Sequence, residues 1–141
     1  MAEKMETYAY FIFILLAWGL WGFFGKYALK FISPISLILW ESIGSVIFYL
    51  VISVVLFLNY KFETNATGIT MSILTAFFGV LGIIIFFFTL SKTKSSILVP
   101  LTALYPVITV ILSFVFLKEK VTLAQGAGIV LAIIASVLLS I

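Results

Sequence analysis

Apolar residues follow one another along this chain in five long runs, separated by short polar breaks. The breaks fall at residues 31–34, 59–66, 91–96 and 117–120. The runs between them cover residues 7–30, 34–58, 67–91, 95–117 and 121–141. A helix needs about 20 residues to cross the hydrocarbon core of a bilayer, and each run has about that length. The pattern therefore predicts an all-α polytopic membrane protein whose five transmembrane helices form a single domain over residues 1–141.

The first break is the weakest because it carries no charge. Its signal is Ser33-Pro34, since proline suits the first turn of a helix and disfavours helix in the residue before it. The N-terminal run extends from Tyr8 to Gly25 without the small-residue cleavage site of a signal peptide. We therefore expect this run to remain in the protein as a spanning helix.

Composition supports the membrane assignment and narrows the chemistry. Hydrophobic residues make up 65% of the chain and charged residues 9%, whereas a soluble domain of this size needs a far more polar surface. The sequence contains no cysteine, histidine, aspartate or arginine. This excludes disulfides, thiolate nucleophiles and the commonest soft metal ligands, so we expect neither a cofactor nor an enzymatic activity. The net charge of +3 gives no basic stripe for nucleic acid.

The lysines are balanced across the predicted membrane. Five spans place four lysines on each side: Lys4, Lys61, Lys118 and Lys120 on one, and Lys26, Lys30, Lys92 and Lys94 on the other. Orientation normally follows an excess of Lys and Arg on the cytoplasmic side. Here the counts give no such excess, either by chance or because the chain inserts in both orientations.

The C-terminal third combines prolines, a charged turn and a small-residue helix in a fixed order. Its features are Pro100, residues 104–107 (LYPV), residues 116–119 (FLKE), Thr122, Gln125 and Gly128. This order resembles the closing two helices of an EamA-type repeat of the drug/metabolite transporter superfamily. The opening stretch AWGLWGFFGKYALKFISP, at residues 17–34, is similar to the first helix of that repeat. The resemblance covers nearly the whole chain.

Typical members of that superfamily have ten helices, built as two five-helix repeats in opposite orientations. The resemblance therefore implies that this chain is one half of an inverted-repeat transporter and pairs with a second half. Five helices alone are too few to surround a cavity and gate it on both sides, and transporters commonly place their site between inverted repeats. Balanced lysines are what an antiparallel homodimer would require, while a related five-helix chain is the alternative partner.

The first span carries two tryptophans and three glycines at intervals of three residues. Trp18 falls at the middle of the span, whereas tryptophan usually lies at the membrane interface. Trp21 lies about 60° further round the same helix. We predict that both bind substrate, with packing against a neighbouring helix as the alternative. Gly19, Gly22 and Gly25 would allow another backbone to approach closely.

The fourth span contains two prolines and is expected to bend. Pro100 and Pro106 each remove an intrahelical hydrogen bond, so a kink should lie near Tyr105 at the middle of the span. Irregular backbone at this depth is tolerated where it faces protein or a wet cavity. Tyr105 and Thr109 are therefore candidate substrate-binding residues, with a static kink as the alternative.

Two charged residues lie inside the first hairpin. Glu41 is the only glutamate well inside a span, and Lys26 lies on the same side of the membrane. An unpaired carboxylate at this depth is costly, so we expect Lys26 and Glu41 to approach each other. The pair would serve as a structural lock or gate, or Glu41 would couple proton movement to transport.

The last span has small residues at intervals of four, namely Gly128, Ala132 and Ser136. Such a face suits helix association in membranes. The resemblance implies that the last helix of each half packs against its inverted mate, so we predict a dimer contact here.

We expect a small secondary transporter in the cell membrane that moves a small organic metabolite, amino acid or drug-like compound by alternating access as an antiparallel dimer. The alternatives are a membrane subunit without transport activity and a flippase for a lipid-linked substrate. The sequence has no nucleotide-binding motif, so a gradient or the substrate itself would supply the energy. Highly phosphorylated substrates are disfavoured because they would need several cations.

Overall fold

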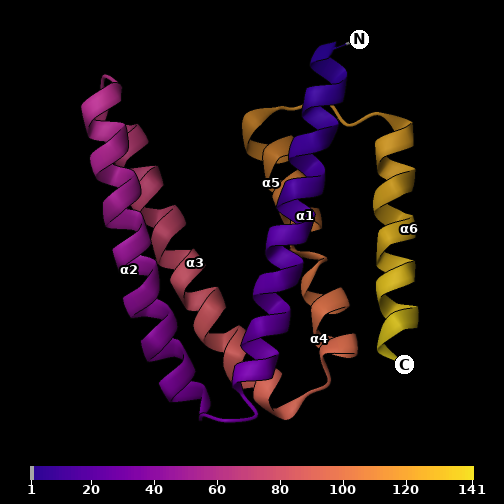
Figure 1. Ribbon diagram of the computed structural model, residues 1–141. Coiled ribbons are helices and arrows are strands. Elements are labelled where there is room, and N and C mark those ends of the chain that lie inside the picture. The colour runs from indigo at the N-terminus through magenta and orange to yellow at the C-terminus, as the bar shows by residue number, and fades with distance from the viewer. Residues whose placement is uncertain (1) are drawn as a thin grey trace. The chain divides into compact units, whose positions relative to one another are not determined.

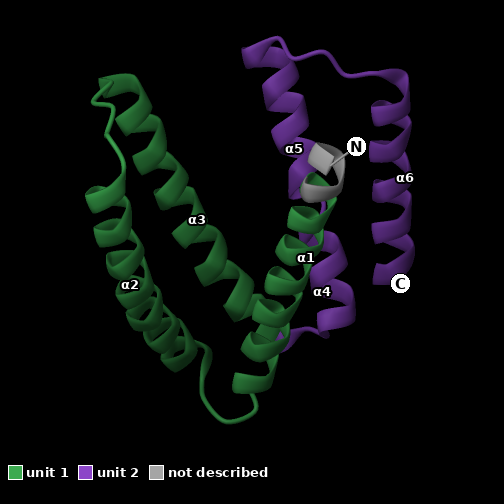
Figure 2. Cartoon of the chain, turned by 45° about the horizontal axis from the view of Figure 1, so that its top comes forward, with its two compact units in different colours: residues 1–91 green, residues 92–141 purple. Residues whose placement is uncertain are grey.

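The computed structural model describes the backbone of residues 2–141 and the side chains of residues 7–141. Within these residues, five helical spans are long and apolar enough to cross a membrane: Thr7–Ala28, Pro34–Asn59, Ala66–Lys92, Ser95–Leu117 and Leu123–Ser140. The predicted all-α membrane fold is confirmed, and the bounds differ little from those read from the sequence. The chain divides into two compact units, residues 1–91 and 92–141 (Figure 2).

Unit 1 contains three helices, α1 (Ala2–Ala28), α2 (Pro34–Asn59) and α3 (Ala66–Lys92). They alternate in direction, so the C-terminal ends of α1 and α3 lie at the same end of the unit (Figure 1). The weak first break works as the sequence predicts. The Ser33 hydroxyl accepts a hydrogen bond from the backbone N–H of Ser36 at 3.2 Å, and Pro34 occupies the first turn of α2.

The second break ends in another helix cap. The Oδ1 atom of Asn65 accepts a hydrogen bond from the backbone N–H of Gly68 at 3.0 Å, at the start of α3. This bond satisfies one of the N–H groups that the first turn of a helix leaves without an intrahelical partner. A polar loop with a capping asparagine therefore begins α3 sharply at the membrane surface.

Unit 2 contains α4 (Ser95–Thr102), α5 (Tyr105–Leu112), the π-helical turn η1 (Ser113–Leu117) and α6 (Leu123–Ser140). The segments α4, α5 and η1 together make the fourth span. Helix α6 returns antiparallel to that span and packs against α4 (Figure 1). It begins with a capping box, in which Thr122 and Gln125 each bind the other's backbone N–H through a side-chain oxygen.

The turn between η1 and α6 contains a strained residue. Lys118 adopts a left-handed conformation with φ of 57°. Its N–H donates to the carbonyl of Ser113, which closes the π-helical turn. This conformation is costly for a residue with a Cβ and is the ordinary conformation of glycine at the end of a helix.

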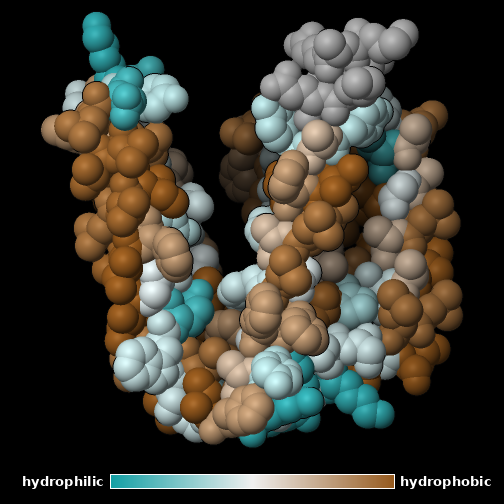
Figure 3. Space-filling view, viewed as in Figure 1, coloured by the Kyte–Doolittle hydropathy of each residue, from teal (hydrophilic) through white to brown (hydrophobic). Residues whose placement is uncertain are grey.

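Apolar side chains cover the shafts of the helices, while hydrophilic residues gather near their ends (Figure 3). Phe48, Tyr49 and Phe57 on α2 each keep about 70% of their surface exposed. A helix that is apolar all round is typical of a membrane span, because lipid then serves as its solvent. The surface is thus suited to contact with the lipid bilayer, and the chain is a multi-pass membrane protein.

Candidate functional site

The best-buried part of unit 1 is the junction between the C-terminal ends of α1 and α3. Phe87 and Leu90 of α3 are 1% and 0% exposed. The Trp21 ring of α1 stacks on Phe86 with ring centroids 5.2 Å apart, and it lies 5.3 Å from the ring of Phe87. We call these residues, with Gly25 and Lys26, the α1–α3 junction. Trp21 therefore packs against a neighbouring helix.

Gly25 is the glycine that permits this approach. A Cβ atom built on Gly25 would lie 2.5 Å from Cε1 of Phe87, which is closer than real side chains allow. The same construction at Gly19 and Gly22 meets no atom within 4 Å. Of the three evenly spaced glycines of α1, only Gly25 thus makes a close helix contact. Trp18 lies outside this packed end and keeps 60% of its surface exposed.

Lys26 binds the end of α3. Its Nζ donates a hydrogen bond of 2.7 Å to the backbone carbonyl of Leu90. The last four carbonyls of a helix have no intrahelical donor, and that of Leu90 is one of them. A cation at the C-terminal end of a helix also interacts favourably with the helix dipole. The ammonium group therefore ties α1 to α3 at the membrane edge.

Glu41 is half-buried and has a different partner. Its Oε1 accepts a hydrogen bond of 3.2 Å from the hydroxyl of Ser45, one turn later in α2. The approach of Lys26 to Glu41 that we expected does not occur, and no ion pair joins these two described residues. Instead, the ammonium group of Lys26 donates to the carbonyl of Leu90, and a hydroxyl on the same helix as Glu41 donates to its carboxylate.

The fourth span is interrupted between α4 and α5. Helix α4 ends at Thr102 and α5 begins at Tyr105, so the break consists of residues 103–104. Pro100 lies inside α4, and Pro106 lies in the first turn of α5. The break lies near the middle of the span.

The hydrogen bonds at the break are shifted from the helical pattern. The N–H of Leu104 donates to Leu101 at 3.2 Å, and that of Val107 donates to Leu104 at 3.0 Å, each three residues back. Pro106 has no N–H to donate. Three carbonyls thereby lose the donor that a continuous helix would supply: those of Pro100, Thr102 and Ala103.

The side chains around the break add further acceptors. The hydroxyl of Thr102 donates to the carbonyls of Leu98 and Val99 at 3.0 Å, and that of Thr109 donates to Tyr105 at 3.4 Å. Each hydroxyl proton is thus directed to the helix backbone, which leaves the oxygen lone pairs as acceptors. The ring of Tyr105 is 53% exposed, one turn from Thr109. The break therefore offers acceptor groups beside an aromatic ring.

The three small residues on one face of α6 differ in their exposure. Ser136 is 8% exposed, so it is already covered within the chain. Gly128 is open, since a Cβ atom built there meets nothing within 4 Å, and Ala132 is exposed. A contact with another chain would therefore involve Gly128 and Ala132 more than Ser136.

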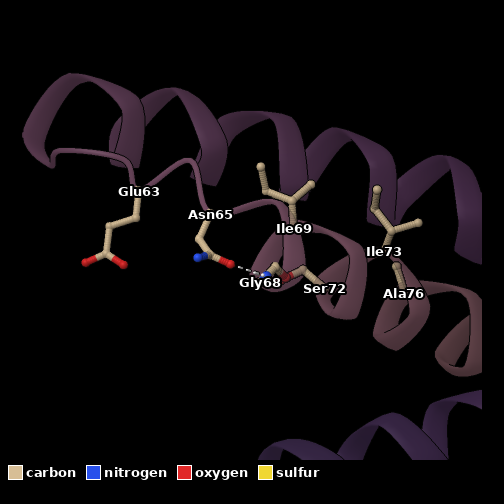
Figure 4. A pocket seen from close by; sticks show the side chains of 7 residues that line it. All are labelled: Glu63, Asn65, Gly68, Ile69, Ser72, Ile73 and Ala76. Carbon is tan, nitrogen blue, oxygen red and sulfur yellow. Dashed lines mark hydrogen bonds between the residues drawn. The ribbon is translucent and has the colours of Figure 1, made fainter.

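A shallow hollow of about 410 Å³ lies at the start of α3 (Figure 4). Its lining residues come from α3 and the loop before it: Glu63, Asn65, Gly68, Ile69, Ser72, Ile73 and Ala76. Figure 4 shows the Asn65 side chain turned toward the first turn of α3, where it makes the capping bond. The polar groups here thus serve to start the helix.

The partners of α1 were not predicted from the sequence. Phe86, Phe87 and Leu90 belong to the run IIIFFFTL at residues 83–90, in which every position is equally apolar except Thr89. Such a run has no polar face to show which side meets protein. The three adjacent phenylalanines were the only available signal, since bulky aromatic residues commonly form helix contacts.

In the described residues, five apolar spans, one of them interrupted between two prolines, define a multi-pass membrane protein. The model of the EamA-like transporter family matches residues 5–141. The chain therefore belongs to this family, whose members are transporters rather than enzymes. The resemblance found in the sequence is confirmed over nearly the full length.

The chain is also similar to a protein of Methanocaldococcus jannaschii that is described only as uncharacterized. The two are 43% identical over 94 residues, which cover 65% of this chain and 69% of the relative. No solved structure matches the chain.

Proposed function

We propose that this chain is one half of a transporter for a small organic molecule, and that two copies assemble antiparallel around a cavity that opens alternately to each side. The observation that carries the proposal is the broken fourth span. Backbone carbonyls without helical donors are tolerated at membrane depth only where they face protein or a wet cavity. Tyr105 beside the break is half exposed in one copy, so a second copy would complete the enclosure.

The charge pattern supports opposite orientations for the two copies. Lysines occur near both ends of the spans: Lys26, Lys30, Lys92 and Lys94 at one end, and Lys61, Lys118 and Lys120 at the other. The side chain of Lys4 lies outside the described residues. With so little bias, neither orientation is favoured by the positive-inside rule.

In this proposal Trp18, Trp21, Tyr105 and Thr109 contribute to substrate binding. Trp18 and Tyr105 are the stronger candidates because their rings keep large exposed surfaces. Trp21 would act mainly by holding the α1–α3 junction, from which it stacks on Phe86.

Lys26 and Glu41 have gating and coupling roles in the same proposal. The bond from Lys26 to Leu90 holds α1 and α3 together at one end of the unit, so its release would let the helices separate there. Glu41 has a hydroxyl rather than a cation as its hydrogen-bond partner. In this proposal Glu41 is the coupling group because it is a carboxylate inside a span. Gly128 and Ala132 form the contact with the second copy.

Orientation can be measured directly, because the chain has no cysteine and any introduced thiol is unique. In the Ile141→Cys variant, a membrane-impermeant maleimide applied to intact cells should label about half of the chains. Labelling after detergent treatment gives the total. Labelling of nearly all chains, or of none, in intact cells contradicts the antiparallel homodimer.

Transport is tested with three probes that share one phenyl ring: phenethylamine, phenylalanine and phenylacetate. We expect liposomes that contain the protein to take up at least one of them faster than protein-free liposomes. The Trp18→Ala variant should lose most of this uptake. If none of the three enters faster than through lipid alone, the transport proposal is wrong.

A further inference from the structure

The broken fourth span carries information about the substrate as well as about the fold. The carbonyls of Thr102 and Ala103 lie at the end of α4, and helix carbonyls point toward the C-terminal end of the helix. They therefore point into the break at residues 103–104. Acceptors without donors are costly in a hydrocarbon environment, so a ligand that supplies donors gains by binding there.

The groups around the break offer no cation to bind an anion, and the phenol of Tyr105 is a neutral donor. The hydroxyls of Thr102 and Thr109 already donate to the helix backbone. The chain has no arginine, and the lysines of unit 2 lie at residues 92, 94, 118 and 120, at the ends of its spans. A carboxylate or phosphate at the break would find no cation there, and the carbonyl oxygens would repel it.

We propose that the break binds the ammonium group of a primary amine, through hydrogen bonds from its N–H groups to the freed carbonyls. This inference rests on the proposed transport function and names its substrate class. A primary ammonium has three donors and one positive charge, which matches three carbonyls that lack their helical donors. The half-exposed ring of Tyr105 contacts the apolar or charged part of the same molecule.

Binding is measured with the purified full chain in detergent, by titration with two probes of equal charge. Phenethylammonium carries three N–H donors, whereas phenethyltrimethylammonium carries none. We expect phenethylammonium to bind about tenfold or more tightly, the factor that one or two charged hydrogen bonds provide. Equal affinities, or tighter binding of the trimethylated probe, would overturn the proposal.

Two matched proline variants connect this preference to the break. Pro106→Ala restores an N–H that can donate to Thr102, so the tenfold preference should fall toward equality. Pro34→Ala makes the same chemical change in the first turn of α2, where the N–H has no intrahelical acceptor, and should keep the preference. A preference that persists in a folded Pro106→Ala chain contradicts the assignment. If that variant does not fold, the comparison of the two probes on the unaltered chain still decides.

Two further outcomes distinguish this inference from its alternatives. Sodium is another cation that unwound carbonyls bind, so the titrations are run in sodium chloride and in choline chloride. A signal that follows sodium and ignores the amine refutes the ammonium site. If phenylacetate is transported and phenethylamine is not, the transport function stands and the substrate class is wrong.

Discussion

The α1–α3 junction makes a quantitative prediction about a single methyl group. In the Gly25→Ala chain the new Cβ would lie 2.5 Å from Cε1 of Phe87. Phe87 is 1% exposed and its ring contacts the rings of both Trp21 and Phe86, so it has little room to move. Overpacking of this kind costs about 1–3 kcal/mol. We expect Gly25→Ala to destabilise the folded chain by that amount.

The control is the same substitution one turn earlier. At Gly22 a Cβ meets nothing within 4 Å, and alanine favours helix over glycine by up to about 1 kcal/mol. Gly22→Ala should therefore leave stability unchanged or raise it. Thermal unfolding in detergent, followed by tryptophan fluorescence, reports both variants, because Trp21 belongs to the junction. If Gly25→Ala and Gly22→Ala unfold at the same temperature, the junction is not packed as described.

Three further substitutions test separate parts of the structure. Lys26→Met removes the hydrogen bond to Leu90 and should destabilise the chain by about 1.5–3 kcal/mol in the same unfolding assay. Lys30→Met, at a residue whose Nζ lies 5.3 Å from the ring centroid of Tyr27, should change stability by less than about 1 kcal/mol, and equal effects would refute the role of Lys26. Lys118→Gly relieves a left-handed residue and should raise stability by about 1 kcal/mol, whereas a loss would contradict that backbone conformation. Glu41→Gln should abolish any stimulation of uptake by a proton gradient, and unchanged stimulation would exclude proton coupling through Glu41.

The spans and their limits could be predicted from the sequence because the membrane imposes them. In a bilayer each local feature predicts one structure. Long apolar runs predict spans, Ser33-Pro34 predicts the start of a helix, and the charged turn at residues 117–120 predicts a loop between spans. The interruption of the fourth span could also be predicted from the local sequence, because Pro106 has no N–H to donate to Thr102 in any helix.

Contacts between helices could not be predicted in the same way. Lys26 was expected to meet Glu41 because opposite charges within reach usually pair in a membrane. Lys26 donates instead to the carbonyl of Leu90, a backbone group that no residue letter reveals. Likewise, the sequence does not show which of Gly19, Gly22 and Gly25 makes a close helix contact. Only the position of Phe87 identifies Gly25 as that residue.

The central claim is that two copies meet in opposite orientations through α6. Ala132 lies near the middle of this helix, whereas Gly128 lies one turn nearer its start, about 6 Å along the axis. If two copies of α6 pair antiparallel and are centred on the middle of the membrane, Ala132 of one copy lies beside Ala132 of the other. The two Gly128 residues are then about 12 Å apart along the helix axis. A disulfide requires Cα atoms within about 7 Å.

Disulfide cross-linking of single-cysteine chains in membranes therefore tests the claim most directly. We predict that the Ala132→Cys chain forms a covalent dimer on mild oxidation and that the Gly128→Cys chain does not, although its thiol reacts with a membrane-permeant maleimide. Efficient dimers from both variants would indicate parallel helices and contradict the account.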